Sequence, residues 1–277
     1  MTEKLLNLAA YLAFGYKFQS MITILSPAKR LNFESPAGTE TYSQPDFVDR
    51  SELLINKLRK TSGKKLGELM NISKDLVSLN KERYENWSPD HQPSNSKQAL
   101  LAFQGDVYIG LQAEDFGEED LSFAQDHVRI LSGLYGILKP LDLMQPYRLE
   151  MGTQLPVRRK KNLYDFWGDS IAEELNQAVE ASGSEYLINL ASGEYFGAVN
   201  QKKLNVPVIT PDFLDWKTDR YKPIQFFLKK ARGFMTRYIV EERVNSPEGL
   251  KEFNLEGYSF NEELSTDEKP VFTRRQD

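Results

Sequence analysis

Two hydrophobic stretches of the chain each end in a group of polar side chains. We predict that both stretches are strands, at residues 21–25 and 186–190. The polar residues are Ser26 and Lys29 after the first strand, and Asn189, Ser192 and Glu194 at the end of the second. Ligands often bind at the carboxyl ends of strands in an α/β sheet, so Lys29 can meet a phosphate or a carboxylate there. The alternatives are a solvated lysine in a Ser-Pro turn and Ser192 as the N-cap of a following helix.

A glycine-rich run at residues 130–142 offers a different kind of anion site. Gly133 and Gly136 follow a predicted helix and allow positive φ angles, so the turn can expose backbone N–H groups to a phosphate. Lys139 lies in the same run and is a further candidate for phosphate binding. Helix–hairpin–helix modules hold nucleic-acid backbones in this way without reading the base sequence. The alternative is a glycine C-cap followed by a packed turn.

Arg148 and Glu150 are charged residues within an otherwise hydrophobic segment. A charge in such surroundings needs a partner, so one interpretation is an ion pair between these two side chains. The other is that Arg148 clamps a phosphate or a carboxylate through two parallel hydrogen bonds. The sequence leaves both interpretations open.

A basic cluster opens the helix that we predict at residues 231–244. Its members are Lys229, Lys230, Arg232 and Arg237, whose spacing places several cations along one side. Positive charge at a helix N-terminus opposes the helix dipole. We therefore expect an anion or an acidic partner at this place.

Charge is distributed unevenly along a chain whose net charge is −5. Residues 217–243 carry eight basic and three acidic side chains, and residues 148–161 carry five basic and one acidic. The compensating acids lie in residues 114–126 and 248–268. This distribution permits a basic cleft on an acidic protein, which is the local potential that phosphate binding needs.

Composition excludes several classes of chemistry. The chain has no cysteine, which removes disulfides, thiolate zinc sites, iron–sulfur clusters and cysteine nucleophiles. His91 and His127 are the two histidines and lie far apart in the sequence. No Walker A loop and no G-x-S-x-G elbow occurs. We predict no cofactor and no metal site, and we assign no catalytic residue.

Strands and helices alternate in the hydrophobic pattern. The pattern predicts helices at 47–58, 118–131, 163–179 and 231–244, two short helices within 64–86, and a short helix from Glu194. It predicts strands at 21–25, 186–190, 206–209, 224–228 and 270–273. Residues 105–110 fit a strand or a helix end equally well, and residues 132–156 are predicted to be an ordered, packed loop.

These elements favour an α/β fold with a mixed sheet flanked by helices, in a single domain at residues 21–277. Residues 1–20 are predicted to be an extension outside the fold. Their hydrophobic stretch is too short to span a bilayer and lacks a clean cleavage site, so we expect a cytoplasmic protein with no membrane partner.

Several longer segments resemble one known family, the YaaA family of peroxide-stress proteins. They are SPAK at 26–29, FQGDVYIGLQAE at 103–114, LSGLYGILKPLDLMQPYRLEMG at 131–152, LYDFWGD at 163–169, INLASGEYF at 188–196 and KKARGFMTRY at 229–238. The resemblance extends over roughly residues 21–275, and its central run is long enough to be specific.

The resemblance implies a compact α/β domain with a positively charged cleft that binds double-stranded DNA. It also implies a helix–hairpin–helix-like element, which we place at residues 132–136, and a role in limiting damage from hydrogen peroxide by keeping free intracellular iron low. Because the chain has two distant histidines and no cysteine, we expect an indirect effect on iron, or shielding of DNA, rather than iron storage.

Two other functions remain open from the sequence. The first is an enzyme that acts on a nucleobase or nucleotide in one pocket formed by Lys29, Arg148, Asn189, Ser192 and Glu194. The second is a structural or regulatory protein that binds its partner through the acidic stretch near the C-terminus. The sequence identifies no protein partner.

Overall fold

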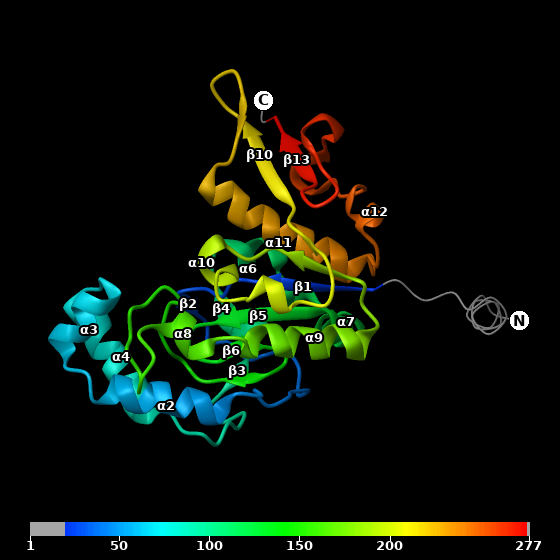
Figure 1. Cartoon of the computed structure of the whole chain (residues 1–277). Helices are drawn as coiled ribbons and strands as arrows, with labels where there is room; N and C mark the ends of the chain where they lie inside the picture. Colours follow the sequence, from blue (N-terminus) through cyan, green and yellow to red (C-terminus); the bar gives the residue numbers. More distant parts are fainter. Residues whose placement is uncertain (1–19, 276–277) are drawn as a thin grey trace, which may run out of the picture.

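A five-stranded sheet lies at the centre of the computed structural model, which describes residues 20–275 (Figure 1). Its strands are β6 (Gly136–Leu138), β5 (Val128–Ser132), β1 (Met21–Leu25), β8 (Tyr186–Asn189) and β9 (Val208–Ile209), in that spatial order. The strands β5, β1, β8 and β9 run parallel, and β6 pairs antiparallel with β5. The carboxyl ends of β5, β1 and β8 therefore meet at one edge of the sheet.

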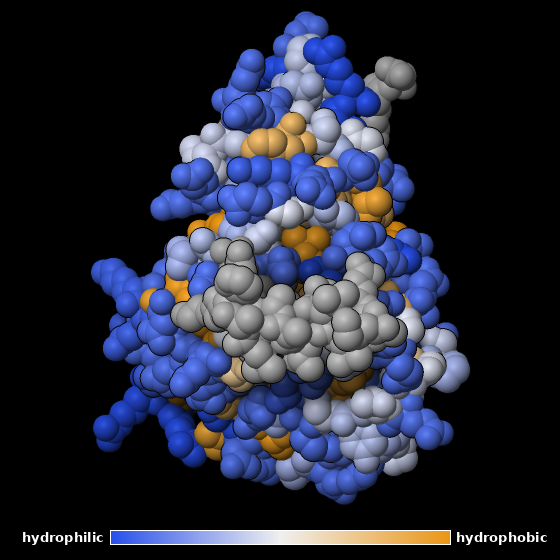
Figure 2. Space-filling model, turned by 90° about the vertical axis from the view of Figure 1, so that its right-hand side faces the viewer, coloured by the Kyte–Doolittle hydropathy of each residue, from blue (hydrophilic) through white to orange (hydrophobic). Residues whose placement is uncertain are grey.

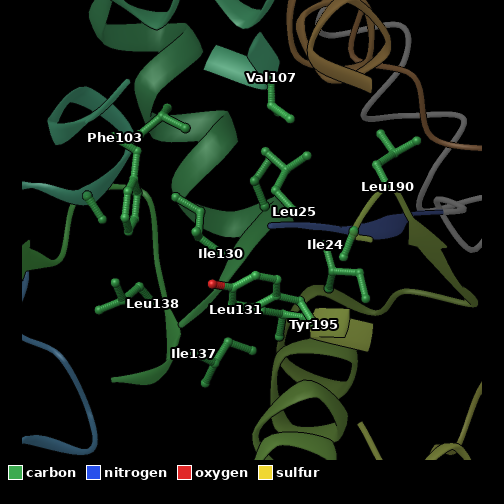
Figure 3. Packing of buried hydrophobic residues seen from close by; sticks show 14 of the residues in the cluster. Ile24, Leu25, Phe103, Val107, Ile130, Leu131, Ile137, Leu138, Leu190 and Tyr195 are labelled. Atoms are coloured by element: carbon green, nitrogen blue, oxygen red, sulfur yellow. The ribbon is translucent and has the colours of Figure 1, made fainter. Parts of the chain in front are cut away.

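The central strands are continuous hydrophobic runs because both of their faces are covered. Every residue of β1 and of β5 is buried, as expected for parallel strands between layers of helices. Side chains such as Ile24, Leu25, Ile130 and Leu131 pack with residues of β6 and of the segment after β8 (Figure 3). This core fixes the positions of the loops that leave the strands.

Helices surround the sheet. The longer ones are α2 (Val48–Arg59), α3 (Gly63–Met70), α4 (Lys74–Asn86), α7 (Glu118–His127), α9 (Ser170–Ser182) and α11 (Gln225–Glu241), and the short ones are α5 (Ala99–Ala102), α6 (Asp106–Leu111), α8 (Leu163–Trp167), α10 (Gly193–Phe196) and α12 (Pro247–Leu250). Single 3₁₀ turns lie at η1 (Ala113–Asp115), η2 (Gln201–Lys203), η3 (Leu255–Gly257) and η4 (Glu262–Leu264). The helices α7 and α9 contact β1, and α11 packs closely on α6.

A second sheet has four strands in the order β11 (Tyr221–Lys222), β10 (Asp212–Trp216), β13 (Val271–Arg274) and β12 (Ser259–Phe260). Two small ladders join β2 (Arg30–Leu31) to β4 (Phe103–Gln104) and β3 (Lys97–Gln98) to β7 (Leu143–Met144). The acidic stretch 248–268 belongs to this second sheet and its surroundings, since β12 lies in it and its Phe253 and Tyr258 are buried.

The structure confirms the mixed α/β fold in one domain and most of the predicted elements. Ser73 caps α4 through its side chain, which separates the two short helices predicted within residues 64–86. Residues 132–156 are ordered and largely buried, as predicted, but they are not a loop throughout, because they contain β6 and β7. The stretch at 105–110, which fits a strand or a helix end equally well by sequence, is helical: Gly105 is the N-cap of α6 and the helix runs from Asp106 to Leu111. Residues 1–19, which contain nearly all of the predicted N-terminal extension, lie outside the described residues.

Three predicted elements are wrong in type or extent. The helix at 118–131 ends at His127, and Val128 begins the central strand β5. Because β5 is buried on both faces, its hydrophobic run does not alternate and is easily read as one side of a helix. The strand at 224–228 is instead the start of α11. The helix at 163–179 is interrupted at Gly168, whose φ of +54° ends α8.

The face at the amino ends of the parallel strands is mainly hydrophilic outside the grey atoms, with small separate hydrophobic patches (Figure 2). Among the helices within residues 20–275, none is both long and hydrophobic enough to cross a bilayer.

Candidate functional site

A pocket of about 610 Å³ opens at the carboxyl ends of the parallel strands. Its walls are the loop after β1, the loop after β8 with α10, the start of α6 and one side of α11. Six of the predicted site residues line it, namely Ser26, Lys29, Ser192, Glu194, Lys229 and Arg232. The pocket therefore joins segments that are far apart in the sequence, at the place where α/β sheets commonly bind ligands.

The two strand-end loops are linked through Ser26. The backbone N–H of Ser192 donates to Ser26 Oγ at 2.8 Å, and the Ser26 hydroxyl donates to Ser192 Oγ at 3.3 Å. The hydroxyl of Tyr108, from α6, donates to the carbonyl of Ser26 at 3.1 Å. Ser192 is the N-cap residue of α10, as the alternative interpretation has it, but its side chain makes no capping bond. Its hydroxyl instead faces Ser26, and Ser192 also belongs to the pocket wall.

Glu150 holds two cations on one side of the pocket. Its carboxylate pairs with Lys29 Nζ at 2.7 Å and with Arg148 at 2.8 Å. Arg148 is largely buried, and its Nε has no hydrogen-bond partner. The ion-pair interpretation of Arg148 and Glu150 is thus confirmed, and the pair reaches the pocket through Glu150 rather than through Arg148 itself.

The helix α11 brings two further cations into the pocket. Lys229 is exposed, whereas Arg232 is half-buried and its Nε is fully buried without a partner. Burial lowers the pKa of Arg232, and the charge of Asp212 opposes that shift. Within residues 20–275, neither cation has a carboxylate within 4.0 Å, so both are available to an anion.

Glu194 and Tyr195 form the wall that α10 contributes. Glu194 Oε1 accepts a hydrogen bond from the backbone N–H of Gly152 at 2.9 Å, and the carbonyl of Glu194 accepts one from the Tyr164 hydroxyl at 2.9 Å. Tyr195 is buried, which raises the pKa of its hydroxyl, and the neighbouring Tyr147 adds to that shift. The Tyr195 hydroxyl therefore stays protonated at neutral pH and can donate a hydrogen bond.

The ionic lining of the pocket is mixed. Four basic residues line it, Lys29, Arg30, Lys229 and Arg232, together with three acidic ones, Asp106, Glu150 and Glu194. The cations of α11 and the carboxylates lie on different walls of the pocket. Asp106 belongs to α6, Glu194 to α10, and Glu150 to the segment just before Gly152. A ligand with both an anionic group and hydrogen-bond donors suits such a lining.

Three further predicted residues do not line the pocket. Asn189, at the end of β8, is buried and bonded to Thr210 Oγ1 at 3.3 Å and to the N–H of Ala191 at 3.1 Å, so its role is structural. The Lys230 ammonium lies 4.6 Å from the centre of the Phe226 ring. Arg237 pairs with Glu241 at 2.7 Å and with Asp115 at 3.5 Å.

The basic cluster also starts later in its helix than predicted. Because α11 begins at Gln225, Lys229 stands in the second turn, where the dipole no longer acts strongly. The expected conflict with the helix dipole is therefore wrong. What makes Lys229 and Arg232 candidates is the pocket that they line.

The glycine turn at residues 133–135 is a β-hairpin between β5 and β6, so the placement of a helix–hairpin–helix element there is wrong. The turn is buried: a Cβ on Gly133 would lie 2.1 Å from the Leu149 carbonyl oxygen, and Gly136 (φ +72°) packs on the Trp167 ring. Its N–H groups cannot meet a phosphate. Both glycines are needed for packing, which is the alternative that the sequence left open.

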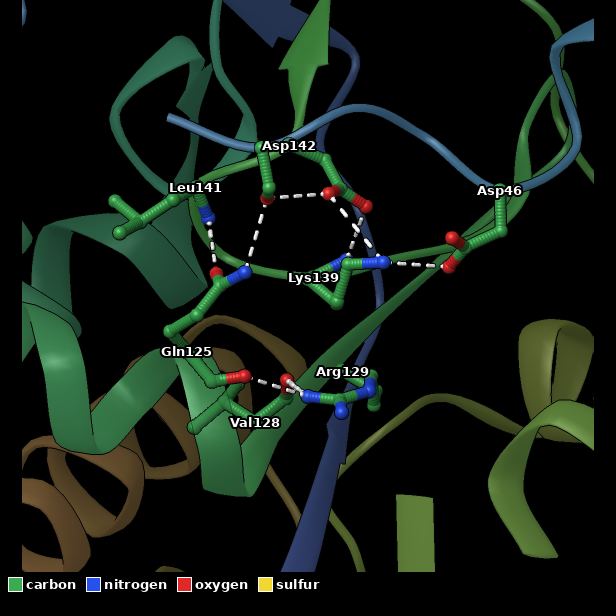
Figure 4. Close-up of polar contacts among 8 residues, drawn as sticks. Asp46, Gln125, Val128, Arg129, Lys139, Leu141 and Asp142 are labelled. Carbon is green, nitrogen blue, oxygen red and sulfur yellow. Dashed lines mark hydrogen bonds and ion pairs between the residues drawn. The ribbon is translucent and has the colours of Figure 1, made fainter. Parts of the chain in front are cut away.

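Lys139 lies in a polar network away from the pocket (Figure 4). Its ammonium pairs with Asp46 at 2.6 Å and Asp142 at 3.8 Å. Ser43 and the backbone N–H of Lys139 donate to Asp142, and Gln125 links this group to Leu141. Lys139 is thus satisfied by carboxylates and is removed from the candidate site.

Sequence reasoning missed the contribution of α6 to the pocket. Asp106 and Tyr108 line it, because α6 crosses α11 beside the loop after β1. The motif at residues 103–114 contains both side chains. Its secondary structure cannot be decided from the sequence, so the sequence does not predict which of its side chains lie on the same face. Among the described residues, no group of three or more His, Asp or Glu side chains is placed to hold a metal ion.

One comparison with known proteins bears on this site. A family model described as peroxide stress protein YaaA matches residues 21–264, which is most of the chain. The match includes every residue that lines the pocket.

Proposed function

The chain belongs to the peroxide stress protein YaaA family, and from this premise we propose that it binds double-stranded DNA at the pocket opening and thereby limits iron-dependent oxidative damage. One observation carries the proposal. Lys229 and Arg232 line the pocket near the carboxyl ends of the parallel strands without a carboxylate partner among residues 20–275. A half-buried guanidinium without an anion is unfavourable, and a bound phosphate would offset that free energy.

Binding to DNA has a direct consequence for iron chemistry. DNA attracts a condensed layer of cations, and a protein that neutralises phosphates releases them. Iron(II) at DNA reacts with peroxide to give hydroxyl radical next to the bases and sugars. A protein whose cations occupy phosphates lowers the amount of iron at that place and needs no iron site of its own.

A second candidate function is favoured by the carboxylates of the same pocket. Glu150 and Glu194 line a cavity of about 610 Å³, which admits one nucleotide but not a duplex. Carboxylates beside a protonated tyrosine such as Tyr195 are typical general acid–base groups. The alternative is therefore an enzyme that acts on a nucleobase or nucleotide.

The salt dependence of DNA binding tests the first function. We expect the affinity of the wild-type protein for a fluorescent duplex to fall steeply with salt. The double variant Lys229→Gln/Arg232→Gln should bind more weakly, and its slope against log salt should be lower by about two. Lys229→Gln alone, at an exposed position, should show about half of this effect. Equal affinity of the wild type and both variants would exclude this site.

A matched control removes two charges from another part of the chain. Lys217 and Lys222 flank the turn between β10 and β11 and pair with no carboxylate among the described residues. Lys217→Gln/Lys222→Gln should bind DNA like the wild type. A loss as large as that of the pocket variant would mean that only total charge matters.

Glu150→Gln separates the two candidate functions. Removal of this carboxylate frees Lys29 and Arg148, so DNA binding should become tighter. An enzyme that uses Glu150 as acid or base should instead lose turnover of nucleosides or nucleotides. Tighter binding with no turnover in either protein supports DNA binding, and turnover that the substitution abolishes supports the enzyme.

A further inference from the structure

A second cavity, of about 480 Å³, lies beside α2 and α8. Its cations are Arg50 of α2 and three residues of the hairpin at 157–160, which are Arg158, Arg159 and Lys160. Leu53, Val157 and Phe166 supply the rest of its lining. No acidic side chain lines this cavity, in contrast to the pocket at the strand ends.

The four cations are not neutralised by neighbours. Within the described part of the chain, none of them has a carboxylate within 4.0 Å. Burial lowers the pKa of Arg50, and the charge of Glu173 opposes that shift from beyond ion-pair distance. Arg158, Arg159 and Lys160 are exposed. Four like charges in one small region repel each other, so an anion bound among them would be stabilised.

Part of the site is held rigidly before any ligand binds. The Arg50 guanidinium lies 4.6 Å from the centre of the Trp167 ring and 4.9 Å from that of Phe166, and it donates to Ser170 Oγ and to the carbonyl of Phe166. In the hairpin, Val157 and Lys160 exchange backbone hydrogen bonds of 3.1 and 3.0 Å. The tip residue Arg158 has a φ of +53°, an unfavourable region for arginine.

The helix α8 connects this cavity to the pocket at the strand ends. Tyr164 contacts the pocket wall through its hydrogen bond to the carbonyl of Glu194, while Phe166 lines the second cavity. Residues two apart in a helix point in nearly opposite directions, so the two sites lie on opposite sides of α8. A helix with its side chains is about 10–12 Å wide, and phosphates along one DNA strand advance about 3.4 Å each. A backbone segment of a few nucleotides would span a distance of this order.

We propose that Arg50 and the hairpin cations Arg158, Arg159 and Lys160 form a second DNA contact, which binds phosphates of the same duplex whose backbone reaches the strand-end pocket. This inference rests on the proposed function and extends it to a continuous track across α8. Arginines fit phosphate oxygens through paired hydrogen bonds, and the sugar faces of DNA fit Leu53, Val157 and Phe166. A duplex bound along this track would contact unpaired cations of the strand-end pocket on one side of α8 and those of the hairpin cavity on the other.

The test compares two triple variants that remove the same charge. Arg158→Gln/Arg159→Gln/Lys160→Gln changes the hairpin, and Lys217→Gln/Arg220→Gln/Lys222→Gln changes the β10–β11 turn, which lies far from α8 at the top of Figure 1. Equilibrium binding of a fluorescent duplex is measured over a range of salt concentrations. We expect the hairpin variant to bind roughly tenfold more weakly at low salt, with a slope lower by two to three, and the control to match the wild type.

The outcomes separate this inference from the proposed function. If Lys229→Gln/Arg232→Gln weakens DNA binding and the hairpin variant does not, the second contact is excluded and the pocket remains. If the wild type binds no DNA, both are excluded.

A labelled poly-glutamate peptide is the second probe. If the hairpin substitutions abolish binding of this peptide and leave DNA binding unchanged, the cavity serves an acidic protein segment instead. Thermal unfolding of each variant confirms that these exposed substitutions leave the fold intact.

Discussion

At the scale of single residues, Asp142 is the most strongly constrained carboxylate of the polar network around Lys139. Its side chain is fully buried and accepts hydrogen bonds from Ser43 at 2.6 Å and from the backbone N–H of Lys139 at 2.8 Å. Burial raises the pKa of Asp142 to about 6, although the charge of Lys139 opposes this shift. The folded protein therefore binds a proton at Asp142 more tightly than the unfolded chain does.

This shift predicts a specific dependence of stability on pH. The protonated Asp142 contributes stability that is fully present below about pH 4 and is lost as the pH rises through about 6. Asp142→Asn cannot titrate and should lack this component. Between pH 4 and pH 7, the wild type should therefore lose stability relative to Asp142→Asn. The loss in its free energy of unfolding, measured against that of the variant, should be roughly 3 kcal/mol at most.

Urea unfolding of both proteins at several pH values measures this difference. Carboxylates far from Asp142 have the same surroundings in both proteins, so their effects cancel in the comparison. A difference that stays constant from pH 4 to pH 7 would show that Asp142 has an ordinary pKa. Far-UV circular dichroism at each pH confirms that the two proteins start from the same fold.

Some site residues could be predicted individually and others could not. Ser26, Lys29, Ser192 and Glu194 follow parallel strands, and the geometry of a parallel sheet brings such positions together. The partnership of Lys29 with Glu150 depends on the path of the chain between β7 and α8, which no local pattern reveals. The glycines at 133 and 136 have the composition of a phosphate-binding turn, but burial gives them a packing role.

At the scale of elements, the crossing of α6 and α11 positions half of the pocket. Gly110 lies against the backbone of α11, and Gly233 lies against that of α6. A Cβ on Gly233 would be 1.9 Å from the Val107 carbonyl oxygen, and one on Gly110 would be 2.3 Å from that of Lys230. Since these contacts are with backbone atoms, neither side can yield by rotating a side chain. The crossing thus sets the distance of Lys229 and Arg232 from α6.

Gly233→Ala should therefore destabilise the protein by about 2–3 kcal/mol, although alanine normally favours a helix by about 1 kcal/mol over glycine. It should also weaken DNA binding, because α11 must move away from α6. The matched control is Gly67→Ala in α3, where a Cβ would make ordinary contacts at 3.4 and 3.6 Å. Thermal and urea unfolding measure both variants. An unchanged melting temperature for Gly233→Ala would contradict the close crossing.

The secondary-structure prediction succeeded where an element has one covered face or a clear cap, and failed where it is buried on both sides. Ser73 and the spacing of α4 made that helix evident. The hydrophobic pattern places the central strand β5 at the end of α7, because a strand buried on both faces loses its alternation. The same pattern predicts a strand at the hydrophobic start of α11, because a short hydrophobic run fits a strand and a helix equally well.

At the scale of the whole molecule, an acidic protein carries two groups of cations that have no carboxylate partner among the described residues, Lys229 and Arg232 in the strand-end pocket and Arg50 with the 157–160 hairpin. The net charge of −5 does not indicate these groups of cations, because it is dominated by acids in other segments, such as 114–126 and 248–268. The helix α8 contacts both sites, since Tyr164 bonds to the carbonyl of the pocket residue Glu194 and Phe166 lines the hairpin cavity. Local charge counts permit a basic cleft, but only the packing of α6, α8 and α11 determines which cations line a cavity without a carboxylate partner among the described residues.

Protection of individual lysines from acetylation by bound DNA tests the central claim most directly. Mass spectrometry measures the acetylation of each lysine with and without a duplex. Lys29 and Lys229 line the strand-end pocket, whereas Lys202 and Lys217 are exposed elsewhere. We predict that a duplex protects Lys29 and Lys229 severalfold and leaves Lys202 and Lys217 as reactive as in the free protein. Protection of Lys202 and Lys217 with Lys29 and Lys229 unchanged, or no protection at any lysine, would contradict DNA binding at this pocket.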